Sequence, residues 1–179
     1  MGDSYIKIVP QNVLTEEVNE LADKILKFLI DKKIISPDKT DCTLGEPGYC
    51  PGDNYNEILL DDNGLLNLIT NGLELTIGER TVFWANDIQE IKCPNCNTNI
   101  IDLDWGQKIE EWTSNTGDDE IECPNCKKVN SIVDFVFEPA WAFGELGLTF
   151  WNWGTFKESF FAELESITGK KMKIIFGKL

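Results

Sequence analysis

Two cysteine pairs constrain this chain more than any other feature of its sequence. Cys93 and Cys96 enclose Pro-Asn, Cys123 and Cys126 enclose the same two residues, and 26 residues separate the pairs. A Cys-x-x-Cys turn brings two sulfurs to one side, at a separation that fits two corners of a tetrahedron. Because a second turn supplies the other two corners, the sequence predicts one closed metal site with four thiolate ligands.

The chemistry of four thiolates favours a structural metal. They saturate a tetrahedral zinc ion and leave no position for a reactive water, so we expect one structural zinc per chain. Iron accepts the same four sulfurs, and spacing alone does not exclude it. Redox thiols and unpaired core cysteines are the other interpretations; a thioredoxin-like pair, however, needs only one such motif, placed at a helix start.

The paired turns resemble the knuckles of zinc-ribbon domains, a likeness that covers residues 93–126, about a fifth of the chain. Zinc ribbons usually carry glycine after the second cysteine of each knuckle, because glycine tolerates a left-handed backbone. Asn97 and Lys127 stand at these positions here. Lysine adopts that conformation less readily than asparagine, so the geometry of the second turn is an open point of the prediction.

Composition excludes several classes of function. The chain has no histidine, which excludes Ser-His-Asp and Cys-His nucleophile pairs and any histidine general base. Its formal net charge is −15, and residues 93–126 contain eight acidic side chains against Lys108 alone. Such a surface repels a phosphate backbone, so we expect no nucleic-acid partner, whereas a basic protein would be attracted.

The sequence also bears on location. Residues 1–6 contain neither a basic region nor an apolar run, so no signal peptide is expected. No segment reaches the roughly 18 apolar residues of a membrane span. We therefore expect no membrane partner and a cytoplasmic protein, which agrees with thiols that stay reduced for metal binding.

Hydrophobic periodicity predicts an α+β domain: a mainly antiparallel sheet with helices packed on it. Apolar residues three and four apart predict helices, and alternation predicts strands. We expect long helices over 15–33 and 155–168, and the second begins with a capping box at Thr155-Phe156-Lys157-Glu158. Two shorter helical pieces are expected over 54–60 and 65–70, on either side of a turn at 61–64. The expected strands are 73–77 and 81–84, forming a hairpin about Gly78, then 132–137, 146–153 and 171–176.

The metal site also predicts the domain organisation. If Cys93 and Cys126 bind one ion, the strand that enters the ribbon and the strand that leaves it must lie side by side. We therefore expect residues 93–126 to form a zinc-ribbon-like insertion. Residues 1–92 and 127–179 then form one discontinuous α+β domain.

Two segments are candidates for ligand contact. Residues 38–54 are interrupted by glycine and proline and are expected to form a long loop, which is either functional or merely a surface connection. Cys42 and Cys50 of this loop lack a recognisable ligand spacing. Residues 138–156 are rich in aromatic side chains, and this segment is either buried core or a binding platform. We expect a strand there, with Leu146, Leu148 and Phe150 on one face and Thr149, Trp151 and Trp153 on the other. The candidate contact residues are Tyr49, Asp53, Tyr55, Glu138, Trp141 and Glu145.

The aromatic segment, the break at Gly154, the helix that follows and the ending Phe176-Gly177-Lys178-Leu179 resemble a family of uncharacterised bacterial cytoplasmic proteins that also carry paired Cys-Pro-x-Cys knuckles. The resemblance implies a bacterial origin and bound zinc, but no activity. From the residues themselves, the leading hypothesis is a non-catalytic, zinc-stabilised protein that binds a basic protein partner. The alternative is an enzyme or a small-molecule or carbohydrate-binding protein that uses carboxylates and aromatic rings beside a structural zinc.

Overall fold

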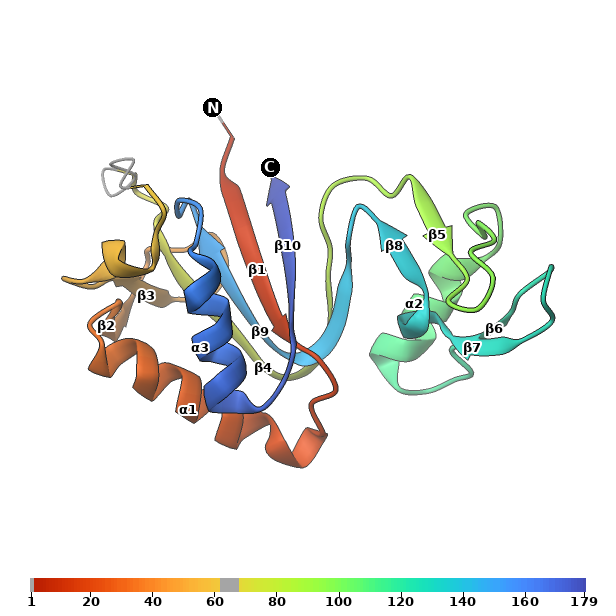
Figure 1. Ribbon diagram of the computed structural model, residues 1–179, viewed down its shortest axis with the longest axis horizontal. Coiled ribbons are helices and arrows are strands. Elements are labelled where there is room, and N and C mark those ends of the chain that lie inside the picture. The colour runs from red at the N-terminus through yellow and green to blue at the C-terminus, as the bar shows by residue number, and fades with distance from the viewer. Residues whose placement is uncertain (1, 62–67) are drawn as a thin grey trace.

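The computed structural model describes residues 2–61 and 68–179, and it consists of a large lobe and a small lobe (Figure 1). The large lobe contains a six-stranded sheet of order β10-β1-β9-β4-β3-β2. Every pairing in this sheet is antiparallel. The small lobe contains one helix and two two-stranded sheets. The prediction of an α+β fold with a mainly antiparallel sheet is confirmed.

The elements divide between the lobes in chain order. The large lobe contains β1 (Ser4–Pro10), α1 (Val18–Asp31), β2 (Ile35–Thr40), β3 (Gly48–Pro51), the short 3-10 helix η2 (Tyr55–Ile58), β4 (Gly72–Phe83), β9 (Ala142–Trp151), α3 (Glu158–Thr168) and β10 (Met172–Lys178). The small lobe contains β5 (Glu90–Lys92), α2 (Trp105–Ser114), β6 (Glu120–Glu122), β7 (Val129–Ser131), the 3-10 turn η4 (Ile132–Asp134) and β8 (Val136–Glu138). A further 3-10 turn, η1 (Thr15–Glu17), leads into α1. None of the helices in the described ranges has the length and apolar character needed to cross a membrane.

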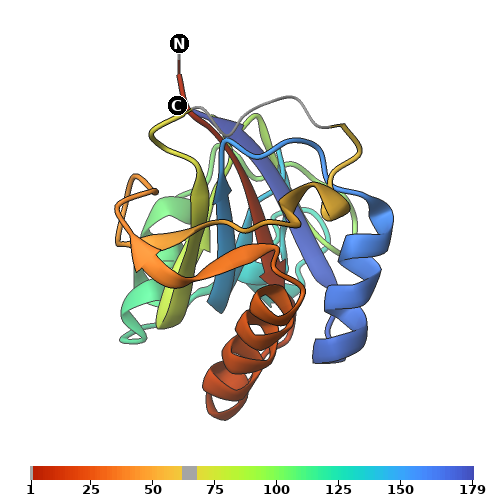
Figure 2. The same ribbon diagram turned by 90° about the vertical axis from the view of Figure 1, so that its left-hand side faces the viewer.

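The core of the large lobe lies between one sheet face and two helices. Alternate residues of β9, namely Leu146, Leu148 and Phe150, are fully buried and point to this core. Helix α1 contributes apolar residues at the predicted spacing, among them Ile25 and Leu29. Figure 2 shows α1 and α3 beside each other on the large lobe, and both belong to the same buried cluster. The helices predicted over 15–33 and 155–168 are therefore present as α1 and α3, and the predicted last strand is present as β10.

The predicted hairpin about Gly78 is wrong. Residues 72–83 form one strand, β4, which pairs with β9 along its whole length. Ile77 is opposite Leu146 and Thr81 is opposite Gly144, so β4 carries extra residues that form a bulge. Gly78 lies in this bulge with φ +83. Gly78 does adopt a backbone conformation typical of turns. Because β9 pairs with β4 on both sides of Gly78, the glycine forms a bulge and the chain does not reverse direction.

The predicted long loop over 38–54 is also wrong in part, because β2 and β3 form a hairpin there. Lys39 pairs with Tyr49, and Pro37 lies within β2. Strand β2 is the edge of the sheet, where a proline without an N–H is tolerated. Pro37, directly before the predicted loop, therefore marks an edge strand.

The chain turns sharply where β9 ends. Asn152 has φ 56, and the turn sends Trp153 into the large core beside Phe150 instead of onto the opposite sheet face. The expected placement of Trp153 is therefore wrong. The capping box at Thr155 is wrong too, since α3 begins at Glu158 with Lys157 as its N-cap and no side-chain cap. Its expected stop at Gly169 is confirmed, with φ +69.

Two shorter predictions have mixed outcomes. The helical piece expected over 54–60 is present as η2. Residues 65–67 of the piece expected over 65–70, and residues 62–64 of the turn expected at 61–64, lie outside the described residues. The strand expected over 132–137 is interrupted by η4, which lets Ile132 and Phe135 both face the small core, and only β8 continues as a strand.

The small lobe has its own core, built around the cysteines. Its buried residues are Ile91, Cys93, Ile100, Ile121, Cys123, Ile132, Phe135 and Phe137. Strand β5 pairs with β8, with Ile91 opposite Phe137, so the chain enters and leaves this lobe along neighbouring strands as expected. The packed lobe reaches beyond 93–126 on both sides, because Ile88 and Trp141 also pack against its core.

Arg80, the only arginine in the chain, joins the two lobes from the β4 bulge. Its Nη1 donates a hydrogen bond to the carbonyl oxygen of Trp112 in α2 at 3.1 Å, and its guanidinium lies 5.5 Å from the centre of that indole ring. Its Nε lies 3.6 Å from the carboxylate of Glu145 in β9. The lobes are therefore held together by the contacts of Arg80 with Trp112 and by aromatic packing, since the ring centre of Phe143 in β9 lies 5.3 Å from those of Trp112 and Phe137 in the small lobe.

Candidate metal centre

The four knuckle cysteines meet at one point of the small lobe. Their Sγ atoms all lie within 4.8 Å of one another. The Sγ atoms of Cys93 and Cys126 are 3.8 Å apart, and those of Cys96 and Cys123 are 3.5 Å apart. A tetrahedron with metal–sulfur bonds of about 2.3 Å has edges of about 3.8 Å. The four sulfurs therefore fit a single tetrahedral metal ion.

The two knuckles share one backbone pattern. In the first, the N–H of Cys93 donates a hydrogen bond to the carbonyl oxygen of Thr98, and the N–H of Asn97 donates one to the carbonyl oxygen of Cys93, both at 2.9 Å. In the second, the N–H of Cys123 donates to Lys128 at 2.9 Å, and the N–H of Lys127 donates to Cys123 at 3.0 Å. The sequence identity of the knuckles is thus repeated in their geometry.

The open point about the second knuckle is resolved by its backbone angles. Asn97 has φ 59 and Lys127 has φ 62, so lysine adopts the same left-handed conformation as asparagine. This conformation costs a residue with a Cβ about 1 kcal/mol or more, and glycine avoids that cost. Lys127 therefore stores backbone strain in the second knuckle.

Lys127→Gly is expected to stabilise the metal-loaded protein by about 1 kcal/mol, because it relieves this strain. The substitution also removes the exposed ion pair with Glu122, whose atoms are 3.8 Å apart and which contributes little. Lys127→Ala is the matched control, since it removes the same ion pair but keeps the strain. Urea unfolding of the three proteins measures the difference, and an equal midpoint for the glycine and alanine variants would contradict the strain argument.

The environment of the sulfurs favours ionisation of some of the four cysteines but opposes four thiolates together. Burial raises the pKa of Cys93, but the amides of Asn95 and Cys96 outweigh it and lower that pKa overall. The hydroxyl of Thr98 lies 3.2 Å from the Sγ of Cys96, and this contact, with the Thr98 amide, lowers the pKa of Cys96 to about 5. The pKa of Cys126 is raised to about 11: the Lys128 amide lowers it, but burial and the three neighbouring sulfurs outweigh that effect. Four thiolates at these distances repel one another, so their joint ionisation requires a cation among them.

The other two cysteines lie in the large lobe, apart from this group. Cys42 is buried, and burial is the main cause that raises its pKa to about 11. The Sγ of Cys50 lies 3.0 Å from the hydroxyl of Thr40. Within residues 2–61 and 68–179, the group of four knuckle cysteines includes neither of them.

The six candidate contact residues do not gather at one place. Tyr49 lies in β3, Asp53 in the turn after it and Tyr55 at the start of η2, whereas Glu138 ends β8. Figure 1 shows β3 in the large lobe and β8 in the small lobe. Tyr49 is part of the large core. The aromatic turn and the Gly/Pro-rich segment therefore do not line a shared cleft.

Trp141 and Glu145 have structural contacts of their own. Trp141 stacks on Phe137 with ring centres 5.5 Å apart. Glu145 accepts a hydrogen bond from the hydroxyl of Thr15 at 3.2 Å and pairs with Arg80. Glu145 therefore helps to hold Arg80, the side chain that reaches across to the small lobe.

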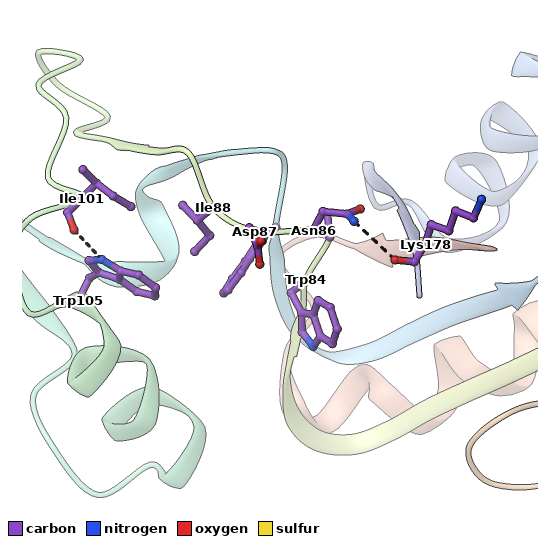
Figure 3. Close-up of a pocket in the computed structure, with 9 residues that line it drawn as sticks. Trp84, Asn86, Asp87, Ile88, Ile101, Trp105 and Lys178 are labelled. Carbon is purple, nitrogen blue, oxygen red and sulfur yellow. Dashed lines mark hydrogen bonds between the residues drawn. The ribbon is translucent and has the colours of Figure 1, made fainter. Parts of the chain in front are cut away.

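A hollow between the lobes was not anticipated from the sequence. Figure 3 shows Trp84 and Asp87 from the segment that follows β4, together with Trp105 from α2. The hollow has a volume of about 680 Å³, and Trp141 also lines it. The signal in the sequence was Trp84, the large aromatic residue directly before Ala85-Asn86-Asp87, at the point where the strand pattern ends.

Comparisons with known proteins give no relative: no family model matches the chain, and searches of curated proteins and of solved structures find no match. The resemblance to a bacterial family therefore stays a prediction.

Proposed function

We propose that this chain is a non-catalytic cytoplasmic binding protein, stabilised by one structural zinc ion, which recognises a basic protein partner. The observation that carries the proposal is the acidic surface of the small lobe. Residues 85–141 contain twelve acidic side chains and four lysines. Only three ion pairs are found among the described residues of that lobe: Glu90 with Lys92, Lys108 with Glu111, and Glu122 with Lys127.

Most of the remaining carboxylates face solvent without a cationic partner. Exposed acidic residues that make no salt bridge within the described chain include Asp102, Asp104, Glu110, Asp118 and Glu120. Their field attracts positively charged surfaces over about 10 Å at ordinary salt and repels nucleic acid. A basic protein is therefore the macromolecule that this surface fits best.

Zinc is the proposed metal, and its role is structural. Sulfur-only tetrahedral sites of this kind most often hold zinc, although iron binds the same ligands. All four coordination positions belong to the protein, so a bound ion has no place for substrate or water. The proposed cytoplasmic location follows from the ligands, because thiols remain reduced and available for metal there.

The alternative, an enzyme or small-molecule-binding protein, has less support. It required Tyr49, Asp53 and Tyr55 to share a cleft with Glu138 and Trp141, and the two groups lie in different lobes. No observation on these residues favours a particular reaction.

Affinity capture from a lysate at low salt tests the proposal. The wild-type protein is compared with a variant in which Asp118, Glu120 and Glu122 are replaced by Asn, Gln and Gln. We expect a basic protein to bind the wild type, to be released by about 0.5 M salt, and to bind the variant at least about tenfold more weakly. Recovery of no basic protein, or equal recovery by both proteins, would count against the proposal.

A further inference from the structure

The hollow between the lobes offers aromatic surface from both sides (Figure 3). Trp84 comes from the large lobe and is 44% exposed, which is unusual for so large an apolar ring. Trp105 and Trp141 come from the small lobe. Tryptophan is enriched where one protein anchors another, so three indoles around one opening indicate a recognition site.

The two indoles of the small lobe are held rigidly. The Nε1 of Trp105 donates to the carbonyl oxygen of Ile101 at 3.0 Å. Trp141 stacks on Phe137 at an interplanar angle of 6° and meets Trp105 edge-on at 6.4 Å. Because these rings are already ordered, a ligand that binds against them loses little side-chain entropy.

The polar groups of the hollow favour a cation. Asp87 is exposed and makes no salt bridge with any described residue. Lys178 lines the same hollow, but Figure 3 shows its ammonium group directed away from Asp87, and its carbonyl oxygen accepts a hydrogen bond from Asn86 at 3.5 Å. Indole faces carry negative potential and bind cations better than other aromatic rings do.

The chain itself contains an example of this chemistry. The Nζ of Lys7 lies 4.7 Å from the centre of the Trp84 ring, on the side of a second, smaller pocket. Arg80 lies over Trp112 in the same way. Indoles of this protein therefore already contact cationic side chains.

We propose that the hollow lined by Trp84, Trp105 and Trp141 receives an arginine side chain of the basic partner, with Asp87 as its counter-charge. The inference rests on the proposed function and names the anchor point of that recognition. Arginine fits better than lysine, because its planar guanidinium is weakly hydrated and stacks on aromatic faces. A volume of about 680 Å³ accommodates the side chain together with its flanking peptide.

The test uses a short acetylated peptide of alternating glycine and arginine and the same peptide with citrulline, the neutral isostere, in place of arginine. Binding to the zinc-loaded full chain is followed by NMR of the indole N–H signals at low salt. We expect the signals of Trp84, Trp105 and Trp141 to shift with the arginine peptide and not with the citrulline peptide. Equal shifts with both peptides would overturn the proposal.

Two variants locate the site. Trp84→Ala is expected to weaken binding of the arginine peptide about tenfold, and Asp87→Asn about threefold. Asp23→Asn is the matched control: it removes the same charge from an exposed position of α1, outside both the hollow and the acidic small lobe, and should change the affinity less than about twofold. The unchanged indole signals of the remaining tryptophans show that each variant is folded.

The outcomes separate the two proposals. Equal affinity of the wild type, Trp84→Ala and Asp87→Asn for the arginine peptide would refute the hollow as the anchor site and leave recognition of a basic partner standing. Absence of binding to any of these proteins at low salt would contradict both the anchor site and the proposed function.

Discussion

Replacement of Cys93 by serine, or removal of the metal by a chelator, is expected to unfold the small lobe and leave the large lobe folded. Cys93 and Cys123 are fully buried members of the small core, so loss of the metal leaves closely spaced thiolates there that must either repel one another or take up protons. A structural zinc contributes on the order of 10 kcal/mol to the folding of so small a module. The large lobe has a separate buried cluster that contains no knuckle cysteine.

Hydrogen exchange with and without chelator measures this effect. Amides of β5, β6 and β7 should lose protection, while those of β1 and β9 should keep it. Cys50→Ser is the matched control, because it makes the same chemical change outside the site. Unchanged protection of residues 93–126 in Cys93→Ser would refute a structural role for the metal.

Elemental analysis of the purified protein identifies the ion, and one zinc per chain is expected. Iron in place of zinc would retain the structural site and change only its metal. If the purified protein contains no metal, the interpretation of the knuckle cysteines as redox thiols is favoured instead. Two metals would indicate that Cys42 and Cys50 belong to a second site.

Asn152→Ala is expected to destabilise the large lobe by about 3 to 4 kcal/mol. Asn152 is buried, has φ 56, and stands at the turn after β9. Its Oδ1 accepts a hydrogen bond from the N–H of Ser4 at 2.8 Å, and its Nδ2 donates to Asp3 at 2.6 Å and to the carbonyl oxygen of Thr70 at 2.8 Å. Alanine loses these bonds and adopts the left-handed conformation poorly.

Two further variants separate the causes. Asn152→Gly keeps the backbone freedom and loses only the hydrogen bonds, so we expect a cost of about 2 kcal/mol. Asn115→Ala, at a left-handed but exposed position after α2, should cost about 1 kcal/mol. Thermal or urea unfolding of the metal-loaded proteins ranks them. An alanine variant at position 152 that is as stable as the glycine variant would contradict the backbone contribution.

The metal site was predictable because its chemistry is local. Each knuckle needs only four consecutive residues and the one that follows, and both knuckles form the same hydrogen-bonded turn. The strand pairing of β5 with β8 followed from the requirement that one ion join the two knuckles. Left-handed Lys127 shows the limit of this reasoning, since the hydrogen-bonded turn of the knuckle overrides a residue preference worth about 1 kcal/mol.

The largest errors of the sequence-based prediction occurred at residues that suit two local structures equally. At these residues, contacts with a segment far away in the sequence determine which structure forms. Gly78 is compatible with a hairpin turn and with a bulge. The bulge forms because β9 pairs with both halves of β4. Pro37 suits a loop and an edge strand equally, and the order of the sheet placed it at the edge. Alternation put Trp153 on the outer face, but the bonds of Asn152 to the chain's first strand turned it inward.

The amino-acid sequence by itself therefore determined the four metal ligands, the α+β class, the main helices and the acidic character of the surface, because these depend on spacing, periodicity and charge. Only the tertiary structure decided which aromatic residues are core and which line a hollow. Trp84 and Trp105 line one hollow from two lobes only because the chain returns on itself between them. Contacts between residues far apart in the sequence leave no periodic signal, so the candidate site between the lobes could be found only from the folded chain.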